Sequence, residues 1–64
     1  MIGREMFIER GNELYVVRRR VKQSMFETKQ HLKLFVDEYY PCDHVMAHDN
    51  HYLLCDRVAD AKIV

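Results

Sequence analysis

The 64-residue sequence predicts a small α+β domain of order ββαββ, in which an antiparallel sheet has one helix packed on one face. Two segments rich in β-branched and aromatic residues, each divided by a turn-forming dipeptide, indicate two hairpins. Between them the apolar residues recur at helical spacing. A chain of this length buries only about 60% of the surface that its unfolded form exposes. We therefore expect a single domain over residues 1–64.

The first hairpin is predicted over residues 4–22. Its strands flank Gly11-Asn12, and glycine at the first central position of a two-residue loop favours a type II′ turn. Such a loop pairs Arg10 with Glu13 and Ile8 with Tyr15. Strand alternation then directs one apolar group to the side expected to meet the helix, namely Ile2, Met6, Ile8, Tyr15, Val17 and Val21. The other side receives Phe7, Leu14 and Val16.

A helix is predicted over residues 25–39. Ser24 and Glu27 have the spacing of a capping box, in which each side chain binds the backbone N–H of the other residue. The residues that form one apolar stripe at helical spacing are Met25, Leu32, Phe35, Val36 and Tyr39. Leu34 falls on the opposite side. Pro41 ends the helix, because the residue before a proline is pushed out of helical geometry.

The second hairpin is predicted over residues 43–58, around a turn at Asp49-Asn50, since both residue types tolerate left-handed backbone. One side of this hairpin carries Val45, Ala47, Tyr52 and Leu54. The other side carries His44, Met46, His48, His51, Leu53 and Cys55. The tail, residues 59–64, ends in apolar residues, so it is expected to add a short edge strand or to pair with a second chain.

Apolar side chains on both sides of the sheet, with only one helix as cover, predict a protein contact surface. At about 25 cal/mol per Å² of apolar area, leaving Phe7, Leu14 and Val16 exposed to water forgoes a few kcal/mol of stabilisation. The expected interface residues are Phe7, Leu14 and Val16 at the centre, Glu9, Arg18 and Arg20 at the rim, and Leu34 as a weaker second candidate. The alternative is that the tail or a curled sheet covers the central group within the same chain.

Five potential transition-metal ligands crowd into one segment: Cys42, His44, His48, His51 and Cys55. In the predicted register His48 faces His51 and His44 faces Cys55, so four residues of strand, about 13 Å, separate the two pairs. Tetrahedral zinc needs every ligand within about 2.3 Å of the ion, so one site cannot use both pairs. We therefore expect no metal or other cofactor unless a second chain or Cys42 completes a site at one pair. Both cysteines are expected to be free thiols.

The net charge of zero is unevenly distributed along the chain. Residues 1–33 hold eight Lys/Arg against four Asp/Glu, and residues 34–64 hold two against six, so the halves carry +4 and −4. This asymmetry fits a nucleic-acid-binding face, a head-to-tail assembly or two solvated surfaces. A nucleic-acid-binding face would use Arg18, Arg20, Lys22, Lys29 and Lys33. A near-neutral pI, and the common use of charge to keep a strand soluble, count against it.

Catalysis is not expected from this sequence. A fold of this size has little room for a pocket of some 300 Å³. Cys55 opposite His44 is the only pair that resembles an activated nucleophile, and no third group orients the histidine. The chain has no glycine-rich oxyanion or phosphate loop. Neither an enzymatic activity nor a small-molecule substrate is therefore predicted.

The sequence thus predicts a small non-catalytic binding or regulatory module, whose partner is another protein or a second copy of itself in a homodimer. A compact chain of this size is typical of a phage or mobile-element accessory protein or inhibitor. The first residues lack the apolar core of a signal peptide, and no apolar run is long enough to span a bilayer. A cytoplasmic protein without membrane contact is therefore expected.

Overall fold

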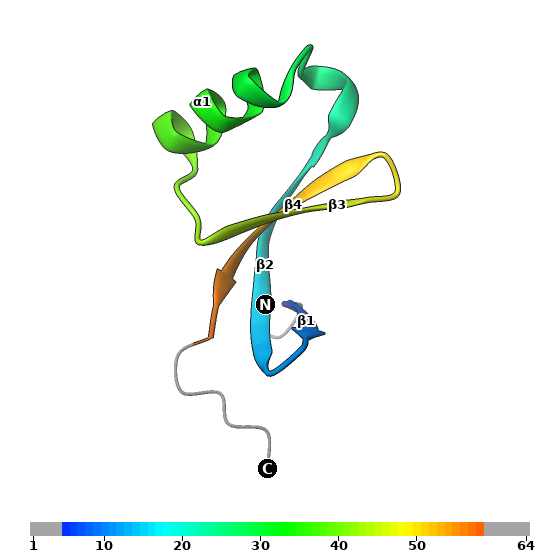
Figure 1. Ribbon diagram of the computed structural model, residues 1–64, viewed down its shortest axis with the longest axis vertical. Coiled ribbons are helices and arrows are strands. Elements are labelled where there is room, and N and C mark those ends of the chain that lie inside the picture. Colours follow the sequence, from blue (N-terminus) through cyan, green and yellow to red (C-terminus); the bar gives the residue numbers. More distant parts are fainter. Residues whose placement is uncertain (1–4, 59–64) are drawn as a thin grey trace.

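The computed structural model describes residues 5–58, which form a four-stranded antiparallel sheet and one α-helix (Figure 1). The elements are β1 (Met6–Arg10), β2 (Glu13–Lys22), a 3-10 turn (Gln23–Met25), α1 (Lys29–Tyr39), β3 (His44–His48) and β4 (His51–Arg57). The strands lie in the order β1-β2-β4-β3, so β1 and β3 are the two edges. The predicted α+β fold of order ββαββ is confirmed. The edge strand predicted at 59–64 lies outside the described residues.

The first hairpin has the predicted two-residue loop and register. Gly11 adopts a φ of 61°, a left-handed conformation that other residues reach only at a steric cost. Its neighbour Asn12 is not among the residues with positive φ, which agrees with the predicted type II′ turn. Arg10 consequently pairs with Glu13, and the pairing continues in register to the start of β1.

The second hairpin closes through a different turn. Asp49 and Asn50 have φ values of 48° and 63°, and positive φ at both central residues is typical of a type I′ turn. Asn and Asp enter this region more readily than other non-glycine residues, because their short polar side chains bond locally. The turn sets His48 opposite His51, and the rest of β3 pairs with β4 in the predicted register.

The helix begins four residues later than the sequence predicts. Thr28 is the N-cap, and its Oγ1 accepts a hydrogen bond from the backbone N–H of His31 at 3.1 Å. Ser24 lies instead in the 3-10 turn that precedes the helix, so the predicted capping box is wrong. The end of the helix is as predicted, since α1 stops at Tyr39, just before Pro41.

Contacts with the second hairpin explain the late start of α1. The backbone N–H of Gln23 donates to the Asn50 carbonyl at 2.8 Å, and its Nε2 donates to the His51 carbonyl at 3.0 Å. Phe26 then packs against Tyr52 of β4, with the ring centroids 6.2 Å apart. These contacts hold the chain against the sheet after β2, so the helix can begin only beyond them.

Strand β2 carries a β-bulge at Arg18. Val17 pairs with Cys55 on β4, but Leu54, the adjacent residue of β4, pairs with Arg19. Arg18 is therefore an extra residue that no residue of β4 opposes. Beyond the bulge, every side chain of β2 points to the side opposite to that expected from regular alternation.

The bulge divides the apolar residues of β2 between the two sides of the sheet. We call the side that carries α1 the helix face and the other side the open face. Val21 packs under α1 on the helix face, whereas Tyr15 and Val17 pack on the open face with Ile8. The prediction that the helix covers Met6, Ile8, Tyr15, Val17 and Val21 together is therefore wrong. The predicted grouping of the second hairpin is confirmed for Val45, Tyr52 and Leu54, which pack on the helix face.

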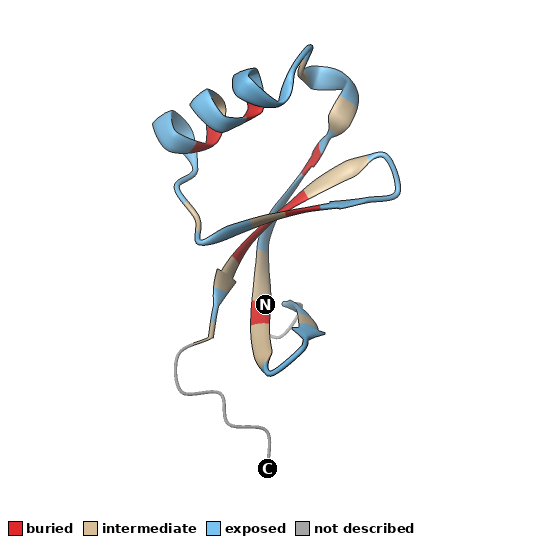
Figure 2. Ribbon diagram, viewed as in Figure 1, coloured by how far each residue is buried: buried red, intermediate tan, exposed pale blue. Residues whose placement is uncertain are grey.

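Two apolar cores result, one on each face of the sheet. Buried residues occur in α1 and in strands of the sheet (Figure 2). The buried residues of the helix-face core are Val21, Leu32, Val36 and Leu54. Those of the open-face core are Tyr15, Met46, Leu53 and Cys55. Strand β4 belongs to both, because its consecutive residues Leu53, Leu54 and Cys55 alternate between the faces and are at most 4% exposed. Helix α1 lies at one end of the molecule, away from β1 (Figure 1).

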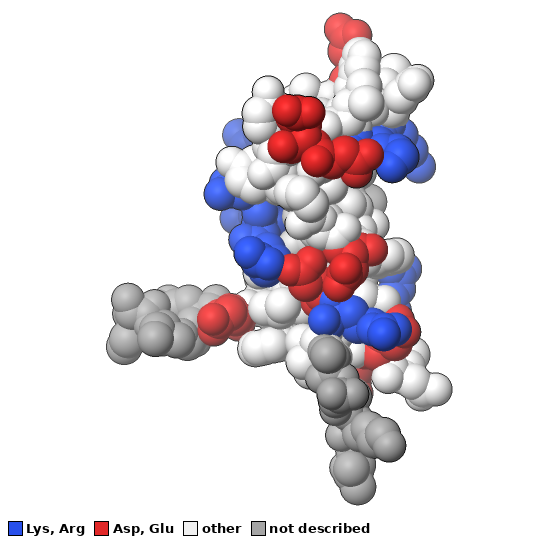
Figure 3. All heavy atoms as spheres, turned by 90° about the vertical axis from the view of Figure 1, so that its left-hand side faces the viewer, with Lys and Arg blue, Asp and Glu red and all other residues white. Residues whose placement is uncertain are grey.

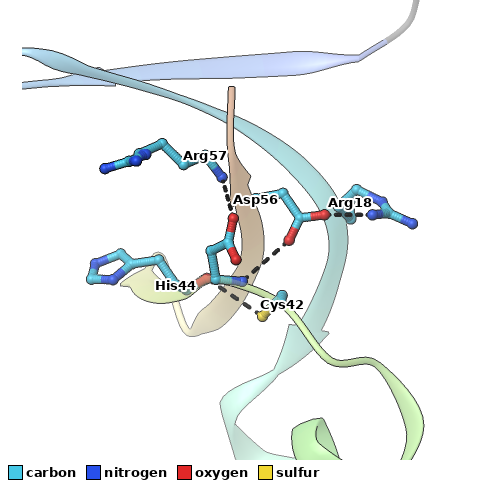
Figure 4. Close-up of polar contacts among 6 residues, drawn as sticks. Arg18, Cys42, His44, Asp56 and Arg57 are labelled. Carbon is cyan, nitrogen blue, oxygen red and sulfur yellow. Dashed lines mark hydrogen bonds and ion pairs between the residues drawn. The ribbon is translucent and has the colours of Figure 1, made fainter. Parts of the chain in front are cut away.

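A polar network joins the bulge to the segment that leads into β3 (Figure 4). Arg18 forms an ion pair with Asp56 on β4. The other oxygen of this carboxylate accepts the backbone N–H of Asp43 at 3.2 Å. Asp43 in turn accepts the backbone N–H of Arg57 through Oδ2 at 2.9 Å. The two carboxylates thus fasten the end of β4 to β2 on one side and to the chain before β3 on the other.

Replacing Asp56 by alanine is expected to lower the free energy of unfolding by about 1 kcal/mol, because Arg18 at the bulge loses its acceptor and the Asp43 N–H keeps only the Cys55 carbonyl, at 3.0 Å. Arg18→Ala is expected to lower it by less than about 1 kcal/mol, since an exposed ion pair contributes little. Asp56→Asn is the matched control, because it keeps an acceptor for the backbone N–H. Urea unfolding followed by circular dichroism measures all three variants. An Asp56→Ala variant as stable as the unchanged chain would contradict this role.

Candidate functional site

The open face carries the candidate site, because α1, the only α-helix within residues 5–58, lies on the other face. Residues paired across strands point to the same side, so the registers assign the members of the open face in rows. These rows are Lys22, His51 and His48; Arg20, Leu53 and Met46; Met6, Val17, Cys55 and His44; Ile8, Tyr15 and Arg57; and Arg10 and Glu13. An apolar centre is thus bordered by basic side chains and histidines.

A groove of about 380 Å³ lies between the edge strands β1 and β3. It is lined by Met6, Ile8, Glu9, Arg10, Met46, Ala47, His48 and Leu53. Strands at opposite edges can line one groove only because the sheet coils, and Arg10 Nη1 on β1 lies 3.4 Å from His44 Nε2 on β3. The expectation that a fold of this size lacks room for a pocket of some 300 Å³ is therefore wrong. Coiling of the sheet, rather than chain length, creates the space.

The open face presents positive charge to a ligand. Its basic residues that take part in no ion pair within the described part of the chain are Arg10, Arg20 and Lys22. The acidic residue in these rows, Glu13, is already engaged: it accepts a hydrogen bond from the Tyr15 hydroxyl and pairs with Arg57 at 2.8 Å. These hydrogen bonds, from Tyr15 first and Arg57 second, lower the pKa of the Glu13 carboxyl. The same contact with Glu13 raises the pKa of Tyr15.

The residues predicted to bind nucleic acid do not form one surface. Arg18 is held by Asp56, and Lys33 is held by Asp37 at 3.0 Å. Arg20 and Lys22 lie together on the open face, whereas Lys29 is at the start of α1 on the other side of the sheet. The bulge separates Arg18 from Arg20 and Lys22, which regular alternation would have kept together.

The opposite charges of the two halves of the chain are interleaved in space. Two ion pairs, Arg18–Asp56 and Arg57–Glu13, join residues of the first half to residues of the second. Figure 3 shows acidic and basic side chains next to one another on one side of the molecule. The charge difference between the halves therefore does not produce one basic end and one acidic end on this side.

The predicted interface residues are divided between the two faces. Those on the helix face are Phe7 and Val16, which pair, and Glu9 and Leu14, which also pair. They are not part of the core under α1, and the Phe7 side chain is 55% exposed. Arg20 lies on the open face, so the prediction that it borders Phe7 is wrong, and the bulge is the cause. Arg18 is bound to Asp56, which pairs with Val16. Leu34 is 60% exposed on α1.

Sequence reasoning missed the groove residues as a set. The sequence places Met6 and Ile8 under the helix. It places Met46 and Leu53 on one side of the second hairpin, without indicating which residues of the first hairpin share that side. One available signal was the run Leu53-Leu54-Cys55, because consecutive apolar residues in a strand indicate burial on both sides. That run required a second core, and the groove lies beside it.

The five potential metal ligands do not converge. Within residues 5–58 no group of three His, Cys, Asp or Glu side chains is placed to hold a metal ion. His44 stacks on Tyr15, with ring centroids 5.4 Å apart. His48 Nε2 lies 3.4 Å from the Asp49 carboxylate, and His51 Nδ1 lies 2.8 Å from the Asp49 carbonyl oxygen. Within the described structure His44 therefore lies apart from His48 and His51, which both contact Asp49 at the turn.

Burial raises the pKa of both cysteine thiols, which are free. Cys55 is 0% exposed in the open-face core, and its thiol donates to the Leu53 carbonyl at 3.4 Å. Cys42 is half-buried against the helix-face core, and its thiol donates to the His44 carbonyl at 3.6 Å. An enclosed thiol with a raised pKa is a poor nucleophile. The pairing of Cys55 with His44 therefore does not provide an activated nucleophile.

Comparison with protein-family models, curated proteins and solved structures finds no match for this chain. Functional conclusions therefore rest on the geometry and charge of the two faces. In the part of the chain that the structure describes, no helix has the length and apolar character needed to cross a bilayer.

The two thiols are expected to react with an aromatic disulfide reagent in two phases. Cys42 should react first, because it is only half-buried, and Cys55 should react only as the sheet opens. Both should react more slowly than free cysteine, since a raised pKa leaves less thiolate. Cys42→Ser and Cys55→Ser variants assign the phases by absorbance. Rapid reaction of both thiols in the folded protein would contradict the placement of Cys55.

Acid is expected to remove the stabilising contribution of Glu13. Because Tyr15 and Arg57 lower its folded-state pKa, this contribution is fully present above the ordinary value of 4.5 and is lost as the pH falls through the lower folded value. Glu13→Gln should therefore melt below the unchanged chain at neutral pH, and the difference in Tm should close in acid. Glu9→Gln, at a carboxylate outside any ion pair of the described residues, is the control. A Tm difference that persists in strong acid would refute this linkage.

Proposed function

We propose that this chain is a small, non-catalytic regulatory module that acts in the cytoplasm and binds another protein through its open face. The observation that supports this most is the apolar groove between two edge strands, which Arg10 lines and beside which Arg20 and Lys22 lie on the same face of the sheet. Protein contact surfaces commonly combine an apolar centre with a charged rim. The groove therefore has the composition of a protein-binding surface.

The groove favours an extended segment with an apolar centre and acidic flanks. Strands β1 and β3 have no neighbour on their outer side within the described sheet, and such edges bind extended chains by strand addition. Met6 and Met46 can adapt to different apolar side chains, because methionine is flexible and polarisable. The basic border attracts carboxylates at the ends of the segment and disfavours a basic one.

The lining of the groove supports binding rather than catalysis. Its ionisable residues are Glu9, Arg10 and His48, and among the described residues no hydrogen bond joins any two of them. General acid–base catalysis needs such groups within hydrogen-bonding reach of each other or of one substrate. Cys55, beside the groove, is enclosed. The proposal therefore assigns no reaction to this site.

Nucleic-acid binding is the second candidate function, because Arg20 and Lys22 on β2 share the open face with His51 on the neighbouring strand β4. Single-stranded nucleic acids bind best where bases can also stack on aromatic side chains. On the open face Tyr15 is 8% exposed and stacks on His44, so its ring is not accessible to a base. The apolar floor of the groove therefore favours a protein segment over a nucleic acid.

Titration with short peptides tests the proposed function. A capped peptide with three apolar residues between aspartates is expected to shift the methyl NMR signals of Met6 and Met46, which line the groove. Met25 is an internal control, because it lies outside the groove and is 60% exposed. The same apolar residues between lysines should bind at least about fivefold more weakly, since like charges repel at the border.

Two results would contradict the proposed function. The first is the absence of shifts at Met6 and Met46 with either peptide at millimolar concentration. The second is equal binding of the acidic and basic peptides, which would remove the role of the border. A shift near Arg20 and Lys22 on addition of an oligonucleotide, with affinity that falls steeply with salt and no peptide binding, would favour the second candidate.

A further inference from the structure

We infer that the segment bound by the groove is supplied by a second copy of this chain, so that copies associate head to tail. In this contact Phe7 of one copy, flanked by Glu5 and Glu9, enters the open-face groove of the next copy. The inference rests on the proposed function, because both use the same groove. It adds the identity of the partner and the direction of the assembly.

Strand β1 presents the kind of segment that the groove favours. Phe7 and Glu9 are two residues apart on β1, so their side chains lie on the same side, the helix face, and Glu5 directly precedes this strand. Phe7 is 55% exposed, and both glutamates are exposed and outside any ion pair of the described residues. The half-buried Leu14 and Val16 extend the apolar surface beside Phe7. One copy therefore offers an apolar centre between two carboxylates.

The opposite side of the same strand helps to form the complementary surface. Met6 and Ile8 contribute one wall of the groove, and Met46 contributes the other. Met6 is 52% exposed, so this wall is open to a partner. Arg10 lies at the end of β1, where it can meet the carboxylate of Glu5 or Glu9 from another copy. A head-to-tail contact would thus bury the exposed apolar residues on both sides of β1.

Charge distinguishes this arrangement from symmetric dimers. Two open faces placed together would set Arg10, Arg20 and Lys22 of one copy against the same bases of the other. Two Phe7 surfaces placed together would set glutamates against glutamates. Like charges disfavour both contacts. The head-to-tail contact instead brings the carboxylates beside Phe7 toward Arg10, Arg20 and Lys22, which outnumber Glu9, the carboxylate that lines the groove. Such a contact leaves a free groove at one end of the assembly and a free Phe7 at the other. Further copies can therefore add at both ends unless the assembly closes into a ring.

Sedimentation of the whole chain over a wide concentration range tests this inference. The average mass should rise beyond two chains. Phe7→Asp removes the inserted side chain, and Met6→Glu places a carboxylate in the groove. Each is expected to weaken association about 30-fold or more. An equimolar mixture of the two variants should form a 1:1 dimer and no larger species, because only one productive contact remains. Leu34→Asp, at an equally exposed apolar residue on α1, is the matched control and should behave as the unchanged chain.

Three outcomes would overturn the inference: a monomer at every concentration, a mass that stops at two chains for the unchanged protein, or a variant mixture that stays monomeric. Glu5→Lys and Arg10→Glu form a second pair that changes only exposed charges, so it serves if the first pair folds poorly. The peptide titration separates the two proposals. Monomers whose Met6 and Met46 signals still respond to the acidic peptide would refute self-association alone, whereas no response would refute both.

Discussion

The β-bulge at Arg18 is the constraint on which the rest of the structure depends. A regular β2 would direct Val21 to the side of Tyr15 and Val17, and the helix-face core would lose its contribution from this strand. The extra residue instead allows one strand to serve both cores. Asp56 binds the bulge from β4 and also accepts a backbone N–H from the segment before β3. One carboxylate therefore connects the irregularity of β2 to the placement of the second hairpin.

The apolar residues of this small chain are divided between two cores, and one of these cores is incompletely covered. Each core has four buried residues, and α1 packs on only one core. The other core is enclosed by the coiling of the sheet, which brings β1 and β3 toward each other across the open face. The groove between these strands is thus a consequence of how the second core is enclosed. Its accessible apolar lining is what makes it suitable for a partner.

Features set within one hairpin could be predicted from the sequence, whereas features set between elements could not. The registers follow from the two-residue turns at 11–12 and 49–50. The bulge arises where β2 meets β4, and the apolar residues on either side of Arg18 keep the spacing of a regular strand. Ser24 and Thr28 are both acceptable caps, and only contacts with the second hairpin select Thr28. The groove was unpredictable for the same reason, since its walls come from strands at opposite edges of the sheet.

The fold also determines which charges remain for a partner. The two halves of the chain carry opposite charge, but β2 and β4 are neighbours, and two ion pairs between them neutralise part of it. Among the described residues, Arg20 and Lys22 remain outside ion pairs on the open face, and Glu9 remains so beside Phe7 on the helix face. The charges outside ion pairs are therefore mainly basic beside the groove, whereas Glu9 is acidic and lies next to Phe7. Basic residues beside the groove and carboxylates beside Phe7 disfavour symmetric pairing and favour contact between these two unlike surfaces.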